Sequence, residues 1–475
     1  MPETELRVGL CGIGLDAYWP QFKGLRARLE SYVQEAAARL EKCGASVENL
    51  GLVDTPQRGR EAGHACRRAD VDLLVIYVTT YALSSTVLPM VQRARVPVLI
   101  LNLQPDASID YETFNRLPNR TAMTGEWLAF CSACPVPEIA NVLSRAGIAF
   151  HQVTGVLKDD AVWAEIGEWI DAARVKKALA ENRLGLMGNY YSGMLDIQTD
   201  LTQVAITFGS HIEHIEVDEL SALGDGVSDE QTAARVDDFR NRFDVQSDCS
   251  HDELARAART SVALEQLVAA HDLQSLAYYY MGSGVPANED TMSSIILGTS
   301  LLTARGIPVA GEYEVKNVLA MKIMDCLGAG GSFSEYYALD LTADTVLMGH
   351  DGPGHIAIAE SKTKVRPLAV YHGKVGRGLS IEMSVKHGPV TLLSVVEDAA
   401  HGFKLLAAEG ESVEGEVLHI GNTNSQYRFS IGAKGFVEAW NAQGPAHHCA
   451  IGVGHLAAKL SKLARLMGIP FVQVC

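Results

Sequence analysis

Apolar runs of strand length alternate with stretches of helical periodicity over the first third of the chain. Runs that predict buried strands occur at Arg7–Cys11, Ser46–Val53, Val71–Val78 and Pro97–Leu103. Between the first two, Leu25–Lys42 has helical spacing and is followed by Gly44. Continuous apolar strands joined by helices indicate a parallel sheet covered on both faces. Ligands of such sheets gather at the carboxyl ends of the strands.

A second α/β unit begins near Asn182. Strands are predicted at the start of Leu184–Met194, in Ser210–Val217, at the start of Leu273–Gly284 and in Ile307–Glu312. Helices are predicted over the acidic stretch Asp225–Arg259, over Met292–Gly306 and over Val315–Leu327. The last of these strands therefore presents Glu312, and a helix follows directly.

The pattern changes after residue 331, where short β-prone runs are separated by Gly, Asp and Asn. These runs are His355–Ser361, Pro367–Gly373, Leu379–Val385, Val390–Asp398, Phe403–Gly410, Gly415–Gly421 and Tyr427–Gly432. Their spacing predicts an antiparallel barrel or sandwich, closed by a helix over His455–Gly468 and a strand over Ile469–Cys475. We therefore predict two parallel-sheet α/β domains, residues 1–176 and 177–330, and a C-terminal β-domain over residues 331–475.

Composition narrows the class of protein. A chain of 475 residues is too long for a single core, and a formal charge of −17 disfavours nucleic acid and anionic membranes as partners. No apolar run approaches the ~20 residues of a membrane helix. The nine cysteines follow no disulfide framework. These features predict a cytoplasmic enzyme for neutral substrates.

Candidate chemistry is concentrated between Gly311 and His355, with one further motif downstream. Glu312 and Glu314 precede a predicted helix, Glu335 follows a glycine-rich loop, and His350 ends a predicted strand. The pair His447–His448 lies about 100 residues later. Carboxylates and imidazoles together form an oxygen and nitrogen donor set that suits Mn²⁺ or a similar divalent ion.

Each of these residues also has a simpler interpretation. Glu312 and Glu335 are placed where a carboxylate can favour the positive end of a helix dipole, and a single histidine such as His350 is more often packed or exposed than bound to metal. Neighbouring residues on a strand point to opposite faces. We therefore expect only one of His447 and His448 to be a metal ligand.

At these residues the sequence resembles the L-arabinose isomerase family. The matching motifs are Gly311–Glu314, Ser332–Tyr337, Leu347–His350 and Gly444–His448. The resemblance implies two flavodoxin-like parallel-sheet domains and a C-terminal antiparallel β-barrel-like domain. It also implies one Mn²⁺, or another divalent ion such as Co²⁺ or Mg²⁺, held by Glu312, Glu335, His350 and His448. The two glutamates would also move the proton, and Glu314 would orient a ligand.

The resemblance implies an aldose–ketose isomerase of a free small neutral sugar, from tetrose to hexose, working through an enediolate. Expected sugar contacts are His447, Tyr81, Gln104, Tyr18 and Met123, of which Met123 replaces a family histidine and Tyr18 lies in a segment unlike the family's. L-arabinose itself is therefore in question. Two alternatives stay open, a sugar epimerase with the same metal centre and a non-catalytic sugar-binding or regulatory protein.

The resemblance also implies assembly. Tyr18, Tyr81 and Gln104 belong to the first domain, whereas the predicted metal ligands belong to the second half of the chain. In the family, the first domain of one subunit closes the metal site of its neighbour. We therefore expect a homo-oligomer, a trimer-based hexamer or a tetramer, with active sites shared between subunits.

Overall fold

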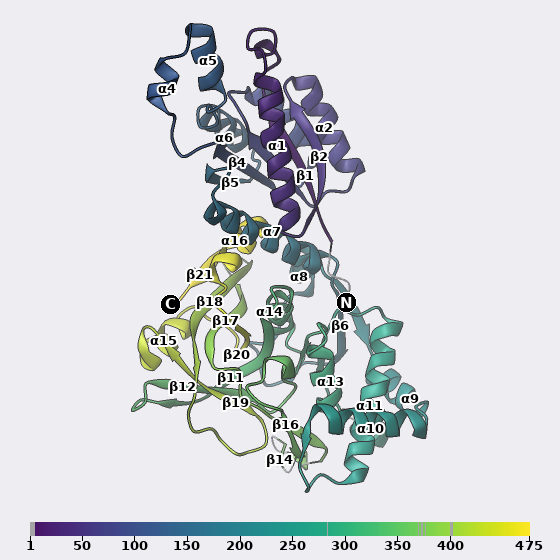
Figure 1. The fold of residues 1–475 in the computed structure, drawn as a ribbon. Helices are drawn as coiled ribbons and strands as arrows, with labels where there is room; N and C mark the ends of the chain where they lie inside the picture. The colour runs from purple at the N-terminus through teal and green to yellow at the C-terminus, as the bar shows by residue number, and fades with distance from the viewer. Residues whose placement is uncertain (1–4, 283, 369, 372–373, 376, 400–401) are drawn as a thin grey trace. The chain divides into compact units, whose positions relative to one another are not determined.

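The computed structural model describes residues 5–475 except residues 283, 369, 372–373, 376 and 400–401 (Figure 1). The chain forms two compact units, one ending at Lys177 and the other running from Ala178 to Cys475. The predicted domain boundary near residue 330 lies inside the second unit, in the turn between a helix and the first strand of the β-domain. Each unit is described separately below.

The first unit is a five-stranded parallel sheet in the order β2-β1-β3-β4-β5, the flavodoxin-like order. Its strands are β1 (Leu6–Ile13), β2 (Ala45–Val53), β3 (Leu73–Val78), β4 (Val98–Gln104) and β5 (Phe150–Val156). Its helices are η1 (Asp16–Tyr18), α1 (Leu25–Lys42), α2 (Pro56–Arg68), α3 (Ser84–Ala94), α4 (Tyr111–Asn115), α5 (Arg120–Leu128), α6 (Val136–Arg145) and α7 (Asp160–Ala180). The predicted first four strands and the helix Leu25–Lys42 are confirmed.

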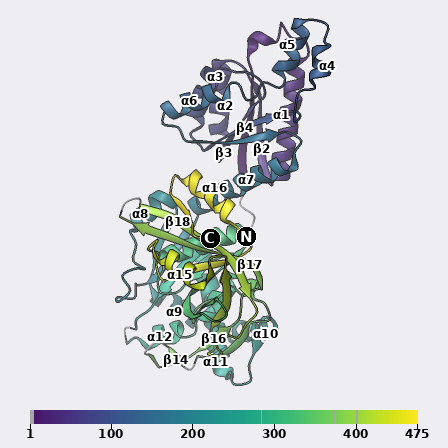
Figure 2. The same ribbon diagram turned by 90° about the vertical axis from the view of Figure 1, so that its left-hand side faces the viewer.

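Helices cover both faces of this sheet, as its continuous apolar strands require. Side chains of α2, α3 and α6 share one hydrophobic cluster with the strands, whereas α1 packs in a separate cluster with Leu52 of β2. Figure 2 shows α2, α3 and α6 on one side of the strands and α1 on the other. The predicted covered parallel sheet is confirmed.

The second unit opens with a parallel sheet in the order β10-β9-β6-β7. Its strands are β6 (Arg183–Gly188), β7 (His211–Ile215), β9 (Ser275–Tyr279) and β10 (Val309–Ala310). The helices of this part are α8 (Leu201–Phe208), α9 (Val217–Asp225), α10 (Asp229–Arg242), α11 (His251–Ala270), α12 (Pro286–Met292), α13 (Ile296–Thr303) and α14 (Val315–Cys326). Strand β6, the first of this sheet along the chain, lies between the next two strands, β7 and β9. Strand β1 lies between β2 and β3 in the same way, so the arrangement of the first unit is repeated.

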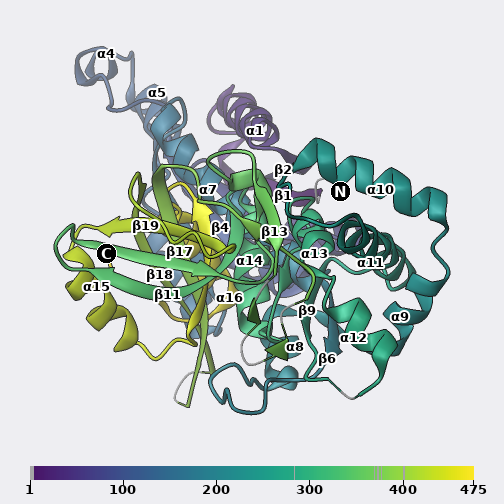
Figure 3. The same cartoon turned by 90° about the horizontal axis from the view of Figure 1, so that it is seen from below.

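The β-domain is a closed antiparallel barrel and not a sandwich. Pairing runs β17-β20-β11-β12-β19-β18, and β18 pairs with β17 to close the ring. Its strands are β11 (Gly330–Asp340), β12 (Thr345–His350), β17 (Gly388–Asp398), β18 (Gly402–Val413), β19 (Thr423–Phe429) and β20 (His448–Val453). Figure 3 shows barrel strands β11, β17, β18 and β19 on the side opposite α10 and α11.

Smaller elements complete the second unit. A three-stranded sheet is formed by β8 (Asp244–Val245), β13 (Lys364–Pro367) and β16 (Leu379–Glu382). A separate hairpin is formed by β14 (Val370–Tyr371) and β15 (Lys374–Val375). Strand β21 (Phe471–Gln473) pairs in parallel with β18, and the remaining helices are η2 (Ile356–Ile358), α15 (Gly432–Asn441) and α16 (Ala457–Met467). The predicted C-terminal helix and strand are confirmed.

Two predicted β-runs are wrong. His355–Ser361 contains the single helical turn η2, whose flank makes one isolated bridge, Ala359 to Val385. Gly415–Gly421 has no strand, because the side chain of Asn424 satisfies both the N–H and the carbonyl of Leu418 in place of a neighbouring strand. Part of the run Pro367–Gly373 lies outside the described residues. Helix α15 was not predicted, although Ala433, Phe436 and Trp440 recur at helical spacing and are buried.

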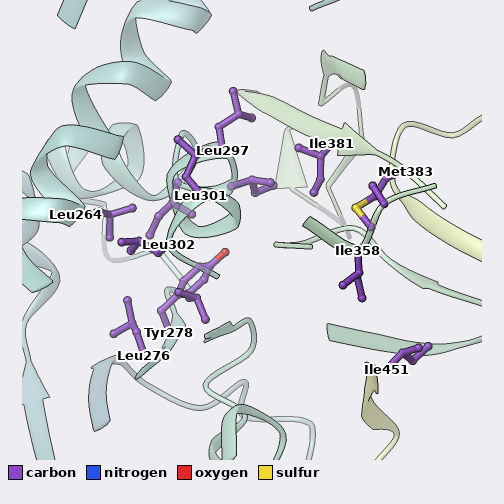
Figure 4. Close-up of a cluster of buried hydrophobic side chains, with 14 of the residues drawn as sticks. Leu264, Leu276, Tyr278, Leu297, Leu301, Leu302, Ile358, Ile381, Met383 and Ile451 are labelled. Atoms are coloured by element: carbon purple, nitrogen blue, oxygen red, sulfur yellow. The ribbon is translucent and has the colours of Figure 1, made fainter. Parts of the chain in front are cut away.

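One hydrophobic core joins the parallel sheet of the second unit to the barrel. It contains Leu276 of β9, Leu301 of α13, Ile381 of β16 and Ile451 of β20 (Figure 4). Neither layer buries its apolar side chains alone, so the sheet and the barrel fold as one unit. Helix α14, whose first turn follows Glu312, packs against the barrel strands β11, β17 and β20.

Candidate metal centre

Glu312 lies in a strained turn between β10 and α14. Glu312 and the following Tyr313 both have positive φ, +56° and +62°, although neither is glycine. Such backbone costs about 1–3 kcal/mol per residue and persists only where the surroundings enforce it. Here the N–H of Tyr313 donates to the carbonyl of Tyr278 in β9, and the Tyr313 ring packs edge-on against Tyr190. The strain is concentrated at the residue that the sequence selects as a metal ligand.

The other predicted ligands come from three neighbouring barrel strands. Glu335 of β11 stands opposite His448, the first residue of β20, and opposite Gly349 of β12 on its other side. His350 ends β12. The glycine-rich loop that leads into β11 turns sharply at Gly328 and Gly330, both with positive φ. Glu335 therefore lies within a strand, which rules out a helix-capping role.

Donor atoms of these residues converge. Glu312 Oε1 lies 3.7 Å from His350 Nε2, and Glu312 Oε2 lies 3.6 Å from His448 Nε2. Two groups of potential ligand atoms, Glu335 with His350 and His448, and Glu312 with His447 and His448, each lie within 4.8 Å of one another. The ring of Phe333 packs against both His350 and His448, with centroids 4.3 and 4.4 Å away. The four predicted ligands thus surround one small volume.

The residues fit a divalent cation. Glu312 Oε2 and His448 Nε2 are buried, yet neither has a hydrogen-bond partner within the described parts of the chain. Buried polar atoms are rarely left unpaired unless a ligand or ion satisfies them. Two carboxylates and two imidazoles form a mixed donor set typical of Mn²⁺, Co²⁺ or a related ion. Together these two observations support the predicted metal site.

Burial and mutual charge set the protonation of this cluster. Burial lowers the pKa of His448, and the neighbouring His350 and His447 lower it further. Burial acts in the same direction on His350, but Glu312, Asp351 and Glu335 raise its pKa overall. Burial raises the pKa of Glu335 against the opposing effect of the histidines. His448 is therefore the neutral imidazole that metal binding requires.

Glu314 lies behind His448. Its side chain is fully buried, and its Oε2 is 3.5 Å from His448 Nδ1, the nitrogen that faces away from Glu312. Lys316 Nζ lies 3.7 Å from Glu314 Oε1. Burial raises the pKa of Glu314 to about 8, with Lys316 acting in the opposite direction. Neither Glu314 oxygen nor His448 Nδ1 has a hydrogen-bond partner within the described residues. Carboxylates near metal-bound imidazoles commonly orient them, and this role stays a prediction for Glu314.

His447 does not point away from His448, so the geometric expectation for this pair is wrong. The two rings lie beside each other with centroids 3.8 Å apart. The reason is that His447 precedes β20, so the alternation of a strand does not apply to it. Its Nε2 is 3.8 Å from Glu312 Oε2 and 3.9 Å from Glu335 Oε2. Both imidazoles therefore face the same volume.

The sequence did not single out Asp196, which contacts this cluster. Asp196 Oδ2 lies 2.6 Å from His447 Nδ1 and accepts a second hydrogen bond from the His447 backbone N–H at 3.0 Å. Asp196 follows β6, and residues beyond the carboxyl ends of parallel strands commonly bind ligands. The place of Asp196 after a predicted parallel strand is therefore the sequence feature that could have identified it as a site residue.

The remaining predicted sugar contacts belong to the first unit. Tyr18 lies in η1 after β1, Tyr81 follows β3, Gln104 ends β4 and Met123 lies in α5, all partly buried. Tyr81 Oη is 3.4 Å from Glu138 Oε2. These residues therefore lie beyond or at the carboxyl ends of strands or in a nearby helix, and their contact with a sugar stays a prediction.

Comparison with known proteins agrees with this geometry. The L-arabinose isomerase C-terminal domain profile matches residues 330–470, which include the barrel and three of the four predicted ligands. An L-arabinose isomerase of Nocardioides sp. is 24% identical over 356 residues, which is 71% of this chain and 68% of the relative. The chain is therefore similar to L-arabinose isomerases over 71–79% of its length, and its barrel matches the C-terminal domain of that family.

Other relatives of this chain carry related names. An L-arabinose isomerase of Leuconostoc mesenteroides is 21% identical over 79% of the chain and 77% of the relative, and a sulfoquinovose isomerase of Priestia megaterium is 20% identical over 70% and 73%. Among solved structures, a solute-binding protein of an ABC transporter from Burkholderia multivorans is 12% identical over 64% of the chain and 97% of that protein, with a TM-score of 0.17 that supports no inference.

Two further features bear on the predictions from composition. Within the described ranges, no helix combines the length and apolar character needed to cross a membrane. All nine cysteines are free thiols.

Proposed function

We propose that the chain is a divalent-metal-dependent aldose–ketose isomerase of a small free sugar. The observation that carries the proposal is the convergence of Glu312, Glu335, His350 and His448 from one helix-flanking turn and three barrel strands. These are the residues that match the family's motifs. Relatives named for two different sugars, L-arabinose and sulfoquinovose, are both isomerases, which supports the reaction class more strongly than any one substrate.

The reaction needs a proton acceptor and donor beside two adjacent carbons of an open-chain sugar. A divalent ion, when bound, acts as a Lewis acid and template for the two sugar oxygens. Glu312 and Glu335 would hold the ion and exchange the proton: one carboxylate takes the proton from C2 of the aldose and the conjugate acid delivers a proton to C1. The hydroxyl proton at O2 passes to O1, which leaves the ketose.

The environment supports this assignment of roles. Glu312 Oε2 and Glu335 Oε2 lie at nearly equal distances, 3.8 and 3.9 Å, from His447 Nε2, so both carboxylates face one reaction volume. The side chains of His350 and His448 are almost fully buried, whereas those of Glu312 and Glu335 are partly exposed. The surrounding carboxylates Asp196 and Asp351 favour a neutral sugar over an anionic one.

The proposal includes assembly and a shared site. We propose a homo-oligomer, a hexamer or a tetramer, in which Tyr18, Tyr81, Gln104 and Met123 contact the sugar bound at a neighbour's metal centre. The separation of these residues from the metal cluster along the chain supports this arrangement. It requires only that the first unit of one subunit reach the second unit of another.

Product analysis by NMR in D₂O tests the function. Purified protein with Mn²⁺, Co²⁺ or Mg²⁺ is incubated with a panel of neutral tetroses, pentoses and hexoses. We expect a ketose from an aldose. Where the C2 proton exchanges with solvent, deuterium appears at C1. An epimer with no ketose would instead indicate an epimerase. No turnover together with no bound metal would favour a non-catalytic sugar-binding protein.

A further inference from the structure

Asp196 is tied to His447 by two hydrogen bonds across 251 residues of sequence. The backbone N–H and the Nδ1 of His447 both meet the same oxygen, Asp196 Oδ2, at 3.0 and 2.6 Å. A carboxylate that receives a backbone and a side-chain hydrogen bond from one residue fixes both the main chain and the ring of that residue. None of the roles assigned above to the glutamates and histidines uses Asp196.

The loop that carries Asp196 is itself held by α14. Lys316 Nζ donates to the backbone carbonyls of Asp196 at 2.7 Å and of Gln198 at 3.0 Å. The Lys316 side chain is only 5% exposed, so these bonds are well shielded from water. Because Lys316 follows Glu312 and Glu314 by a few residues, the segment that presents the glutamates also sets the position of Asp196.

The short contact to Asp196 defines the tautomer of His447. An ionised carboxylate only accepts hydrogen bonds, so Nδ1 of His447 must carry the proton. Burial raises the pKa of Asp196, but the bonds from His447 outweigh it and lower the pKa overall, which keeps the carboxylate ionised. When the ring is neutral, its lone pair is therefore on Nε2. That atom lies 3.8 Å from Glu312 and 3.9 Å from Glu335, beyond hydrogen-bond distance of either.

The side chain of His447 is more exposed to solvent than those of the predicted metal ligands His350 and His448. Its side chain is 34% exposed, whereas those of His350 and His448 are 5% and 0% exposed. Because His447 is partly exposed at the edge of the site, its Nε2 can accept a hydrogen bond from a hydroxyl group of an incoming ligand. His447 Nε2 also lies close enough to Glu312 and His448 to be a third imidazole ligand, so the experiment must separate the two roles.

We propose that Asp196 is a positioning residue that holds His447 with Nδ1 protonated, so that Nε2 accepts a hydrogen bond from a sugar hydroxyl between Glu312 and Glu335. This inference rests on the proposed isomerase function and adds a specificity contact to it. Asp196 is in neither group of potential metal-ligand atoms. It acts through the orientation and tautomer of His447, in the way that carboxylates behind functional histidines commonly do.

The test compares Asp196→Asn and Asp196→Ala with Asp200→Asn. Asp200 lies in the same loop and caps α8 by accepting hydrogen bonds from the backbone N–H groups of Thr202 and Gln203. Asparagine keeps an N-cap acceptor, so this control makes the same change of charge at a residue with no contact to His447. Asp196→Glu tests whether a carboxylate on a longer side chain rescues the effect.

Three measurements are made on the full-length protein. ¹⁵N-histidine NMR of the Mg²⁺-loaded or metal-free protein, with His447→Gln used for assignment, reports the tautomer. Calorimetry with Mn²⁺ alone reports metal affinity, and steady-state kinetics separate kcat from KM. We expect a downfield Nδ1–H resonance from His447 that Asp196→Asn and Asp196→Ala shift or remove. We also expect kcat/KM to fall about 10- to 100-fold, with Mn²⁺ affinity within about threefold of wild type.

The outcomes distinguish the competing explanations. Asp196 variants that match Asp200→Asn in the NMR spectrum and in kcat/KM would overturn the proposal. A loss of Mn²⁺ affinity as large as that in His448→Gln would make His447 a metal ligand instead. In a His447→Gln background, Asp196→Asn should add almost nothing, since the two residues act as a pair. If the wild-type protein isomerises no sugar, the proposed function fails, while the NMR and metal-binding results still decide the Asp196–His447 pair.

Discussion

Glu335 of β11 and His448 of β20 stand directly opposite each other in the antiparallel register of the barrel. This cross-strand pair places a carboxylate and an imidazole side by side without any contribution from a flexible loop. Because successive strand residues alternate between faces, a slip of one residue in this register would turn Glu335 away from His448. The barrel register is therefore a condition for the candidate metal centre.

Glu312→Gln and Glu335→Gln should each lower kcat by about 10²- to 10⁴-fold, because the amide cannot accept or deliver the proton. Both variants should stay folded, since glutamine has nearly the shape of glutamate. Steady-state kinetics and thermal unfolding check these effects. Glu411→Gln, an exposed carboxylate on β18 of the same barrel, is the matched control and should retain activity. Full activity in either site variant would refute its acid–base role.

Metal removal should abolish turnover reversibly. Dialysis against a chelator is expected to inactivate the protein, and added Mn²⁺, Co²⁺ or Mg²⁺ to restore activity. A metal at 100 times its Kd stabilises the fold by about 2.7 kcal/mol, so unfolding should shift on loading. His448→Gln should lose this shift, and His419→Gln, an exposed histidine, should keep it. Turnover that persists in metal-free protein would contradict the metal assignment.

Gly349→Ala should disrupt the barrel beside His350. A Cβ at Gly349 would lie 1.8 Å from the backbone oxygen of Thr423 in β19, a contact that forces β12 and β19 apart. We expect a loss of stability of about 3 kcal/mol and weaker Mn²⁺ binding, measured by urea unfolding and calorimetry. Gly435→Ala in α15 meets no atom closer than 3.6 Å and should stabilise the protein by about 0.5–1 kcal/mol. Equal stability of the two variants would mean that the β12–β19 register is incorrect.

His355 should make the protein less stable in mild acid. It is 4% exposed, and neither ring nitrogen has a hydrogen-bond partner in the described part of the chain. Burial lowers the pKa of His355 to about 4 from its usual value of 6.5. The unfolded chain therefore binds the extra proton first, so stability is unaffected above pH 6.5 and falls as the pH drops from 6.5 toward 4.

His355→Leu removes this contribution. Between pH 7.5 and pH 5, wild type should lose about 2 kcal/mol more than the variant in the free energy of unfolding by urea. Comparing the two proteins cancels the titration of all other groups. Parallel pH profiles would show that His355 is protonated equally well in the folded state.

Activity should depend on assembly. Light scattering and specific activity across a dilution series should change together if a neighbour completes each site. Mixing inactive Glu335→Gln with a Gln104→Ala variant and allowing subunit exchange should restore part of the activity, because some sites then combine one intact half from each variant. A fully active monomer would exclude the shared site while leaving the metal assignment intact.

The sequence by itself determined most of the architecture. Runs such as Leu73–Val78 are apolar at every position, and only a strand covered on both faces buries such a run, so their pattern specifies the parallel sheet. The four motifs likewise selected Glu312, Glu335, His350 and His448 from residue type and order. Local sequence was less informative for segments that form a strand only if another strand lies beside them. His355–Ser361 and Gly415–Gly421 have β-prone composition, but both lack a continuous neighbouring strand.

Only the tertiary structure decided how the candidate site is built. The positive φ of Glu312 and Tyr313 is enforced by packing against Tyr278 and Tyr190, contacts that no local propensity encodes. The two adjacent histidines face one volume because β20 begins between them. Asp196 reaches His447 because the fold brings together residues 251 positions apart. Residue types and local periodicity are properties of short segments, whereas register, strain and long-range hydrogen bonds arise from the closed barrel and the core it shares with the parallel sheet.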